Sequence, residues 1–137
     1  MEPINLNQNL SRHFTLKEMT ASGTAIKHNI DNTPLPEHVE NLKRLCRQLL
    51  EPLRLRFGAI RVTSGYRCPR LNEAVGGVKN SQHIDGEAAD IHVTGVEEGK
   101  KKMAFIKKNL DYGQALLEHR RDGAWWIHLS LPRRRQQ

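Results

Sequence analysis

The sequence predicts a small α+β fold in which helices pack on one side of an antiparallel sheet. The chain has 137 residues, which is enough for one hydrophobic core. Two stretches, 36–57 and 96–110, repeat apolar residues at three- and four-residue steps, the period of an amphipathic helix. Residues 60–64, 88–93 and 114–131 have the short apolar or alternating patterns of strands, bounded by turn residues. We expect these strands to form the sheet that carries the functional site.

The composition indicates a compact domain with long polar loops. Hydrophobic residues make up 37% of the chain and aromatic residues 5%. No apolar run approaches the length of a membrane span, and the start at 1–6 has neither the basic residues nor the apolar stretch of a signal peptide. We therefore expect a single domain over residues 1–137 that is made in the cytoplasm, stays off membranes and is a monomer.

The net charge of +7 comes from 22 Lys and Arg against 15 Asp and Glu. Such an excess attracts polyanions, but the basic residues are scattered. Local runs occur only at 100–102 and 133–135, and no nucleic-acid recognition motif accompanies them. We therefore expect no nucleic-acid partner. A solvated helix face and a basic tail over 132–137 explain the charge equally well.

The two cysteines, Cys46 and Cys68, are too few for a disulfide scaffold and lack metal-site spacing. Cys46 lies on the apolar side of the helix at 36–57, where a small buried thiol is common. We expect both to stay reduced and to take no part in a metal site. A bridge between them is the alternative if the chain reaches an oxidising compartment.

The first part of the chain is expected to hold an irregular segment followed by the first long helix. Residues 1–33 look irregular, apart from a short helix or turn at 13–19. The helix at 36–57 begins with Pro36 in its first turn and ends at Gly58. Pro52 removes a backbone donor and should kink or split the last turn. The histidines of this region are expected on the surface or in packing contacts: His13, His28 and His38.

The middle of the chain carries the most informative stretch, residues 81–90. His83 and Asp90 lie seven residues apart with Gly86 between them, and such a pair supplies one nitrogen and one oxygen ligand for zinc. Taken alone, these residue types in a loop are more often turn formers or surface residues. His92 shares the strand face of Asp90 by the two-residue period, so it competes for a ligand role or lies just behind the ligands.

The last third predicts a helix and a hairpin. In the helix at 96–110, apolar side chains should point inward and the lysine run outward. Strands at 114–120 and 124–131 then surround the loop 121–123, and on the second strand Trp126 and His128 share one face. His128 is the third metal ligand we would choose, because two histidines and one carboxylate with an open fourth position form a catalytic zinc site.

Five blocks in this order resemble the zinc D-alanyl-D-alanine carboxypeptidase family. They are Ser-Gly-Tyr-Arg-Cys-Pro at 64–69, Leu-Asn at 71–72, Gly-Gly at 76–77, Ser-x-His-x-x-Gly-x-Ala-x-Asp at 81–90 and Trp-Ile-His at 126–128. That family includes L-alanyl-D-glutamate endopeptidases of phage lysins and shares its fold with the Hedgehog signalling domain. The similarity runs from about residue 13 to 130, and the N-terminal segment is similar to prophage-type members.

The resemblance implies a zinc peptidase that cuts D-amino-acid-containing bonds in the stem peptides of peptidoglycan. By the matching motif positions, His83, Asp90 and His128 would bind Zn²⁺. Arg67 would face the substrate carbonyl or carboxylate, for which its planar fork of donors is suited. Further substrate contacts are expected from three residues: Ser81, Gln82 and Trp126. The enzyme would be a phage or prophage lysin that reaches the cell wall after release by another factor.

The catalytic base departs from the better-known family members, several of which place an acid three residues before the last histidine ligand. Here that position is Trp125, which cannot exchange the proton. A three-residue loop at 121–123 would pair Glu118 with Trp126 and so place Glu118 on the face of His128. A two-residue turn would instead direct it away. The weaker substitutes for the base are Asp122 and Glu87.

Two other functional classes stay open. The missing acid at position 125 also suits a zinc-bearing, non-catalytic module that binds the cell wall. A nucleic-acid-binding protein driven by charge would show steep salt dependence and indifference to chelators.

Overall fold

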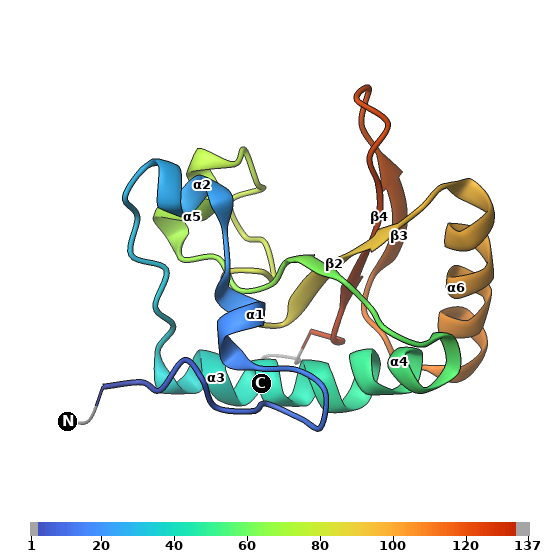
Figure 1. Cartoon of the computed structure of the whole chain (residues 1–137), viewed down its shortest axis with the longest axis horizontal. Helices are drawn as coiled ribbons and strands as arrows, with labels where there is room; N and C mark the ends of the chain where they lie inside the picture. Colours follow the sequence, from blue (N-terminus) through green and yellow to red (C-terminus); the bar gives the residue numbers. More distant parts are fainter. Residues whose placement is uncertain (1–2, 134–137) are drawn as a thin grey trace.

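The computed structural model describes residues 3–133. Short helices come first, then one long helix, and the strands follow with two helices between them (Figure 1). The elements are α1 (Leu16–Thr20), α2 (Gly23–Lys27), α3 (Pro36–Leu45), the π-helical segment η1 (Cys46–Leu50), α4 (Glu51–Phe57), β1 (Val62–Ser64), α5 (Pro69–Ala74), β2 (Ala88–Val93), α6 (Val96–Asn109), β3 (Ala115–His119) and β4 (Trp125–Ser130). No helix in this part of the chain has the length and apolar character of a membrane span.

The four strands form one antiparallel sheet in the order β1-β2-β4-β3. One face of the sheet places fully buried Ile91, Ile127 and Leu129 in the same core as the leucines of α3, η1 and α4. Figure 1 shows these helices as one long rod beneath the sheet, with α6 beside the α4 end of that rod. The alternate residues of β2 and β4 occupy the opposite face, where Asp90 and His128 lie. The predicted α+β class is therefore confirmed.

The long helix expected at 36–57 forms, and its irregularity lies just before Pro52. The backbone N–H of Glu51 donates to the carbonyl of Cys46, a five-residue step in place of the usual four. A regular α-helix would direct the carbonyl of Gln48 at the proline ring, which has no N–H to offer it. The wider π turn accommodates the proline while the leucines around it stay in the core.

Residues 3–33 contain more regular structure than we expected for the segment 1–33. Helix α1 falls close to the short helix or turn anticipated at 13–19, but α2 was not foreseen. Its local signal is weak, because Ala25 is its one buried residue and only the Ser22 side chain, which accepts from the Ala25 N–H at 3.1 Å, marks its start. Of the basic tail predicted at 132–137, residues 134–137 lie outside the described part of the chain.

The lysine run of α6 does not point wholly outward, which corrects the prediction for Lys102. This side chain is buried, its Nζ donates to Glu98 Oε1 at 2.7 Å, and it lies 5.7 Å from the centre of the Phe57 ring. It shares a helical face with Gly99 and Ile106, which are also buried, so its stem packs inward while its charge is paired. Lys100 and Lys101 are exposed as predicted.

The two cysteines are both free thiols, and we expect them to differ sharply in reactivity. Burial in the core raises the pKa of Cys46 to about 12, with the nearby charges of Glu18 and Glu51 adding to the shift. Cys68 is only partly buried. Titration with a thiol reagent should therefore label one thiol in the native protein and two after denaturation. Rapid labelling of Cys46 in the native state would contradict the packing described here.

Candidate metal centre

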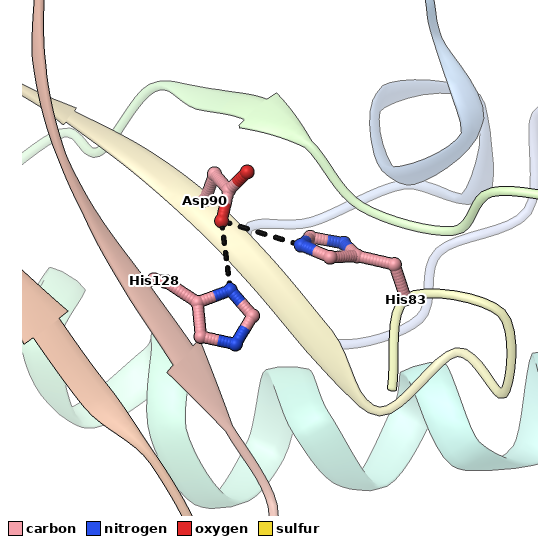
Figure 2. Close-up of side chains that lie close together, drawn as sticks. All are labelled: His83, Asp90 and His128. Carbon is pink, nitrogen blue, oxygen red and sulfur yellow. Dashed lines mark hydrogen bonds and ion pairs between the residues drawn. The ribbon is translucent and has the colours of Figure 1, made fainter. Parts of the chain in front are cut away.

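Three side chains from separate parts of the chain meet on the open face of the sheet (Figure 2). His83 comes from the loop before β2, Asp90 from β2 and His128 from β4, directly opposite Asp90 in the strand register. Each offers a ligand atom, and these atoms lie within 4.8 Å of one another. Asp90 Oδ1 is 3.0 Å from His128 Nδ1 and 3.3 Å from His83 Nε2. Of the described residues, only these three form such a group.

The orientation of the His83 ring is set by a hydrogen bond at Nδ1, the ring nitrogen that faces away from Asp90. Nδ1 lies 2.7 Å from the carbonyl oxygen of Gly65, and the side chain is almost fully buried. A carbonyl can only accept, so Nδ1 carries a proton, and Nε2 is the ring nitrogen that faces Asp90. Metal-binding histidines are commonly held in this way by a backbone carbonyl.

The charge of Asp90 is maintained by its neighbours. Burial alone would raise its pKa, but the hydrogen bonds from His128 and His83 outweigh burial and hold the pKa well below the usual range for aspartate. Its second oxygen, Oδ2, accepts from Arg67 Nη2 at 3.2 Å. Two imidazole nitrogens and one anionic oxygen are the donor set of a catalytic zinc site with an open fourth position. The residues present therefore fit a zinc ion.

Arg67 is held on three sides. Besides Asp90, its guanidinium donates to Ser64 Oγ at 3.0 Å and to Asn72 Oδ1 at 3.2 Å. Asn72, which is almost fully buried, is fixed in turn by donating to the Val78 carbonyl at 2.8 Å. Burial lowers the pKa of Arg67 and the Asp90 carboxylate partly offsets this, but a guanidinium stays charged at neutral pH. Asn72 was not foreseen as part of the site, although it stands in one of the motif blocks.

Gly77 leaves the space in which this network fits. A Cβ at this position would lie 2.2 Å from Asn72 Oδ1 and 3.0 Å from Arg67 Nη1. Gly77→Ala should therefore displace both side chains and weaken zinc binding by roughly 10- to 100-fold, as loss of outer-shell support does. Competition with a chelating dye measures this. Gly95→Ala, with nothing within 4 Å of the added carbon, is the matched control. Equal zinc affinities in the two variants would refute the role of Gly77.

Glu118 lies where the three-residue hairpin loop predicted it. The Arg120 N–H donates to the Ala124 carbonyl at 2.9 Å, and Glu118 pairs with Trp126. Gly123 has a φ of 93°, the left-handed conformation that this loop requires. The register prediction is thus confirmed. The Trp126 indole N–H donates to Glu118 Oε1 at 3.2 Å.

A cavity of about 430 Å³ brings Glu118 together with the metal-ligand group. We call it the metal cavity. Its walls also include Ser81, Trp126 and Arg67, three of the residues expected to contact substrate. Besides Asp90, Glu118 is the one acid among the described residues that lines this cavity.

The two other acids considered for the base lie elsewhere. Glu87 forms an ion pair with Arg44 of α3 at 3.1 Å, on the helix side of the ligand loop. Asp122 is exposed in the hairpin loop, 3.5 Å from Arg120. Neither lines the metal cavity.

Two further residues need a different assignment from the expected one. The structure does not bring Gln82 to the cavity: its buried side chain donates to the Leu131 carbonyl at 2.8 Å and secures the end of β4. The proposed substrate contact is therefore replaced by a structural one. His92 lies two residues beyond Asp90 on the same face, where it lines an adjoining cavity and does not join the ligand group.

On the open face of the sheet, a His-Asp-His group that could hold a metal ion shares one cavity with a glutamate and an arginine. A family model described as Peptidase M15 matches residues 12–130. The chain belongs to the peptidase M15 family, the zinc peptidases of the D-Ala-D-Ala carboxypeptidase type. Comparisons with curated proteins and with solved structures gave no match.

Proposed function

We propose that this protein is a zinc peptidase that hydrolyses D-amino-acid-containing peptide bonds in peptidoglycan stem peptides. The observation that carries the proposal is the gathering of His83, Asp90 and His128 beside Glu118 in one cavity. Membership of the M15 family supports peptide hydrolysis as the reaction. The stem peptide as substrate rests on the family's D-Ala-D-Ala carboxypeptidase type.

The proposed zinc ligands are His83 Nε2, an oxygen of Asp90 and a ring nitrogen of His128. An ion held there would act as a Lewis acid, making a water molecule nucleophilic near neutral pH and polarising the scissile carbonyl. The protein supports this by fixing the orientation of the His83 ring through the Gly65 carbonyl and by keeping Asp90 ionised.

Glu118 is the proposed general base. Its carboxylate takes a proton from the attacking water and delivers it to the departing amine. The Trp126 indole N–H, bound to one carboxylate oxygen, holds the side chain in the cavity and leaves the other oxygen for the proton. Trp126 thus positions the acid from the strand that also supplies His128.

Arg67 is proposed to steady the negative oxygen that develops on the substrate. A guanidinium has five N–H donors, and three of those of Arg67 donate to Ser64, Asn72 and Asp90. Its side chain also lines the metal cavity, so the remaining donors are available to a substrate oxygen. Arg67 therefore serves both Asp90 and the substrate in this proposal.

The proposed setting is a phage or prophage lysin that acts on the cell wall after release. The support is the similarity of the N-terminal segment to prophage-type members and the net charge of +7, which suits a wall with anionic polymers. The proposed partner is the stem peptide alone, with the protein acting as a monomer and without nucleic acid.

The deciding experiment is digestion of purified peptidoglycan by the zinc-loaded protein, with the products identified by mass spectrometry. New amino and carboxyl ends within or at the end of the stem peptide would establish the activity and the bond. The alternative, a non-catalytic zinc-bearing module that binds the wall, is favoured by Trp125 at the position of the usual acid. Stoichiometric zinc and wall binding without any cleavage would support that alternative.

A further inference from the structure

A second cavity adjoins the metal cavity at the metal-ligand group. Its volume is about 450 Å³, and we call it the hairpin cavity because one wall comes from the β3–β4 hairpin. It shares Arg67, Asp90 and Trp126 with the metal cavity, so the two spaces meet at the metal-ligand group. The start of α2, at Ser22–Thr24, also lines this cavity. The two cavities together form one groove that extends along the strands to both sides of Asp90.

The size of the two cavities bears on the length of the substrate. Pockets of about 300–1,000 Å³ enclose molecules of drug size. Volumes of about 430 and 450 Å³ thus give each half of the groove room for more than one alanine residue. An enzyme that only trims a terminal D-alanine would need little space on one side of the bond. The geometry instead accommodates a peptide that continues past the bond in both directions.

The hairpin cavity is cationic. Two guanidinium groups line it, Arg67 and Arg120, against the single carboxylate of Asp90, which is already bound by Arg67 and both histidine ligands. Of the two guanidinium groups, Arg120 has the weaker polar contacts within the protein. Its guanidinium lies 5.4 Å from the centre of the Trp126 ring, and its ion pair with Asp122, at 3.5 Å, is mostly exposed on both sides. Such exposed pairs contribute little, so Arg120 can exchange Asp122 for a ligand carboxylate.

We propose that the hairpin cavity binds a carboxylate-bearing residue next to the scissile bond, that Arg120 determines this specificity, and that the enzyme cuts within an acidic peptide. This inference rests on the proposed peptidase function. Among stem peptides it selects a bond adjacent to D-glutamate with a free carboxylate over the terminal D-Ala-D-Ala bond.

The test separates binding from cleavage. Calorimetry with the zinc-loaded Glu118→Gln protein compares two stem peptides that differ only in one group, the free α-carboxylate of D-glutamate or its amide. We expect the carboxylate form to bind about 10-fold more tightly, and Arg120→Gln in the same background to remove the difference. Arg121→Gln, an exposed neighbour that lines neither cavity, should keep it. Equal binding of the two peptides, or a preference that survives Arg120→Gln, would overturn the proposal.

The cleavage arm uses the wild-type protein and peptidoglycan. Products cut within the stem support the proposal, whereas release of terminal D-alanine alone would overturn it. If the carboxylate preference depends on Arg120 but no bond is cut, the peptidase function fails and the carboxylate site stands by itself.

Discussion

Glu118→Gln is expected to lower peptidoglycan hydrolysis by roughly 10²- to 10⁴-fold, the usual contribution of a positioned general base. The amide has the size of the carboxylate and can still accept from the Trp126 indole N–H, but it cannot take a proton from water. Because Glu118 is not part of the metal-ligand group, zinc stoichiometry and thermal stability should stay close to wild type. Initial rates of release of new amino groups, measured beside zinc analysis of the same samples, give both quantities.

Asp122→Asn provides the matched control for the loss of a carboxylate. Asp122 lies in the same hairpin but is exposed in its loop and does not line the metal cavity. Its substitution should leave the rate within about twofold of wild type, as is usual for a surface site. If Asp122→Asn greatly lowered the rate of hydrolysis while Glu118→Gln kept a near-normal rate, Asp122 would be the general base. That result would refute the assignment of Glu118 from the hairpin register.

Asp90→Asn is expected to abolish zinc binding at micromolar metal and, with it, all hydrolysis. Both histidine ligands face Asp90 Oδ1, and Arg67 binds Oδ2, so the substitution removes the anionic ligand and also leaves a mostly buried guanidinium without its counter-charge. Breaking a buried pair in this way costs about 3 kcal/mol of unfolding free energy. Equilibrium dialysis with zinc and urea denaturation of the metal-free protein measure the two effects separately.

Asp85→Asn is the control for this substitution, because Asp85 lies exposed in the loop that carries His83 and is outside the ligand group. It should keep both zinc affinity and stability. If Asp90→Asn still bound zinc as tightly as Asp85→Asn, the third ligand would have to be sought elsewhere, and His92 would be the first residue to examine.

The parts of the site that could be predicted are those governed by local rules. The pairing of Glu118 with Trp126 follows from the length of one loop and from a glycine that adopts a positive φ. Once the register is set, the two-residue period places Glu118 and His128 on one face. The irregular turn before Pro52 likewise follows from the chemistry of a single residue.

The parts that could not be predicted depend on contacts between distant segments. Gln82 stands in the middle of a motif, yet its amide bonds to a carbonyl 49 residues away, and no pattern within its own loop indicates this. Lys102 is buried because Glu98 and the Phe57 ring of another helix accompany it. The hydrogen bond from Arg67 to Asp90 similarly forms only because β1 and β2 lie side by side.

The loop that carries His83 is tied to the end of β1 by two opposed hydrogen bonds. The imidazole donates to the Gly65 carbonyl, and the Arg67 N–H donates to the His83 carbonyl at 3.0 Å. The other two ligands lie on neighbouring strands in fixed register. The ligand atoms are thus preorganised by the sheet, unlike those of a zinc finger, whose chain folds only around its ion. Metal uptake then requires little ordering of the chain, and zinc stabilises the folded state only through mass action at an already formed centre.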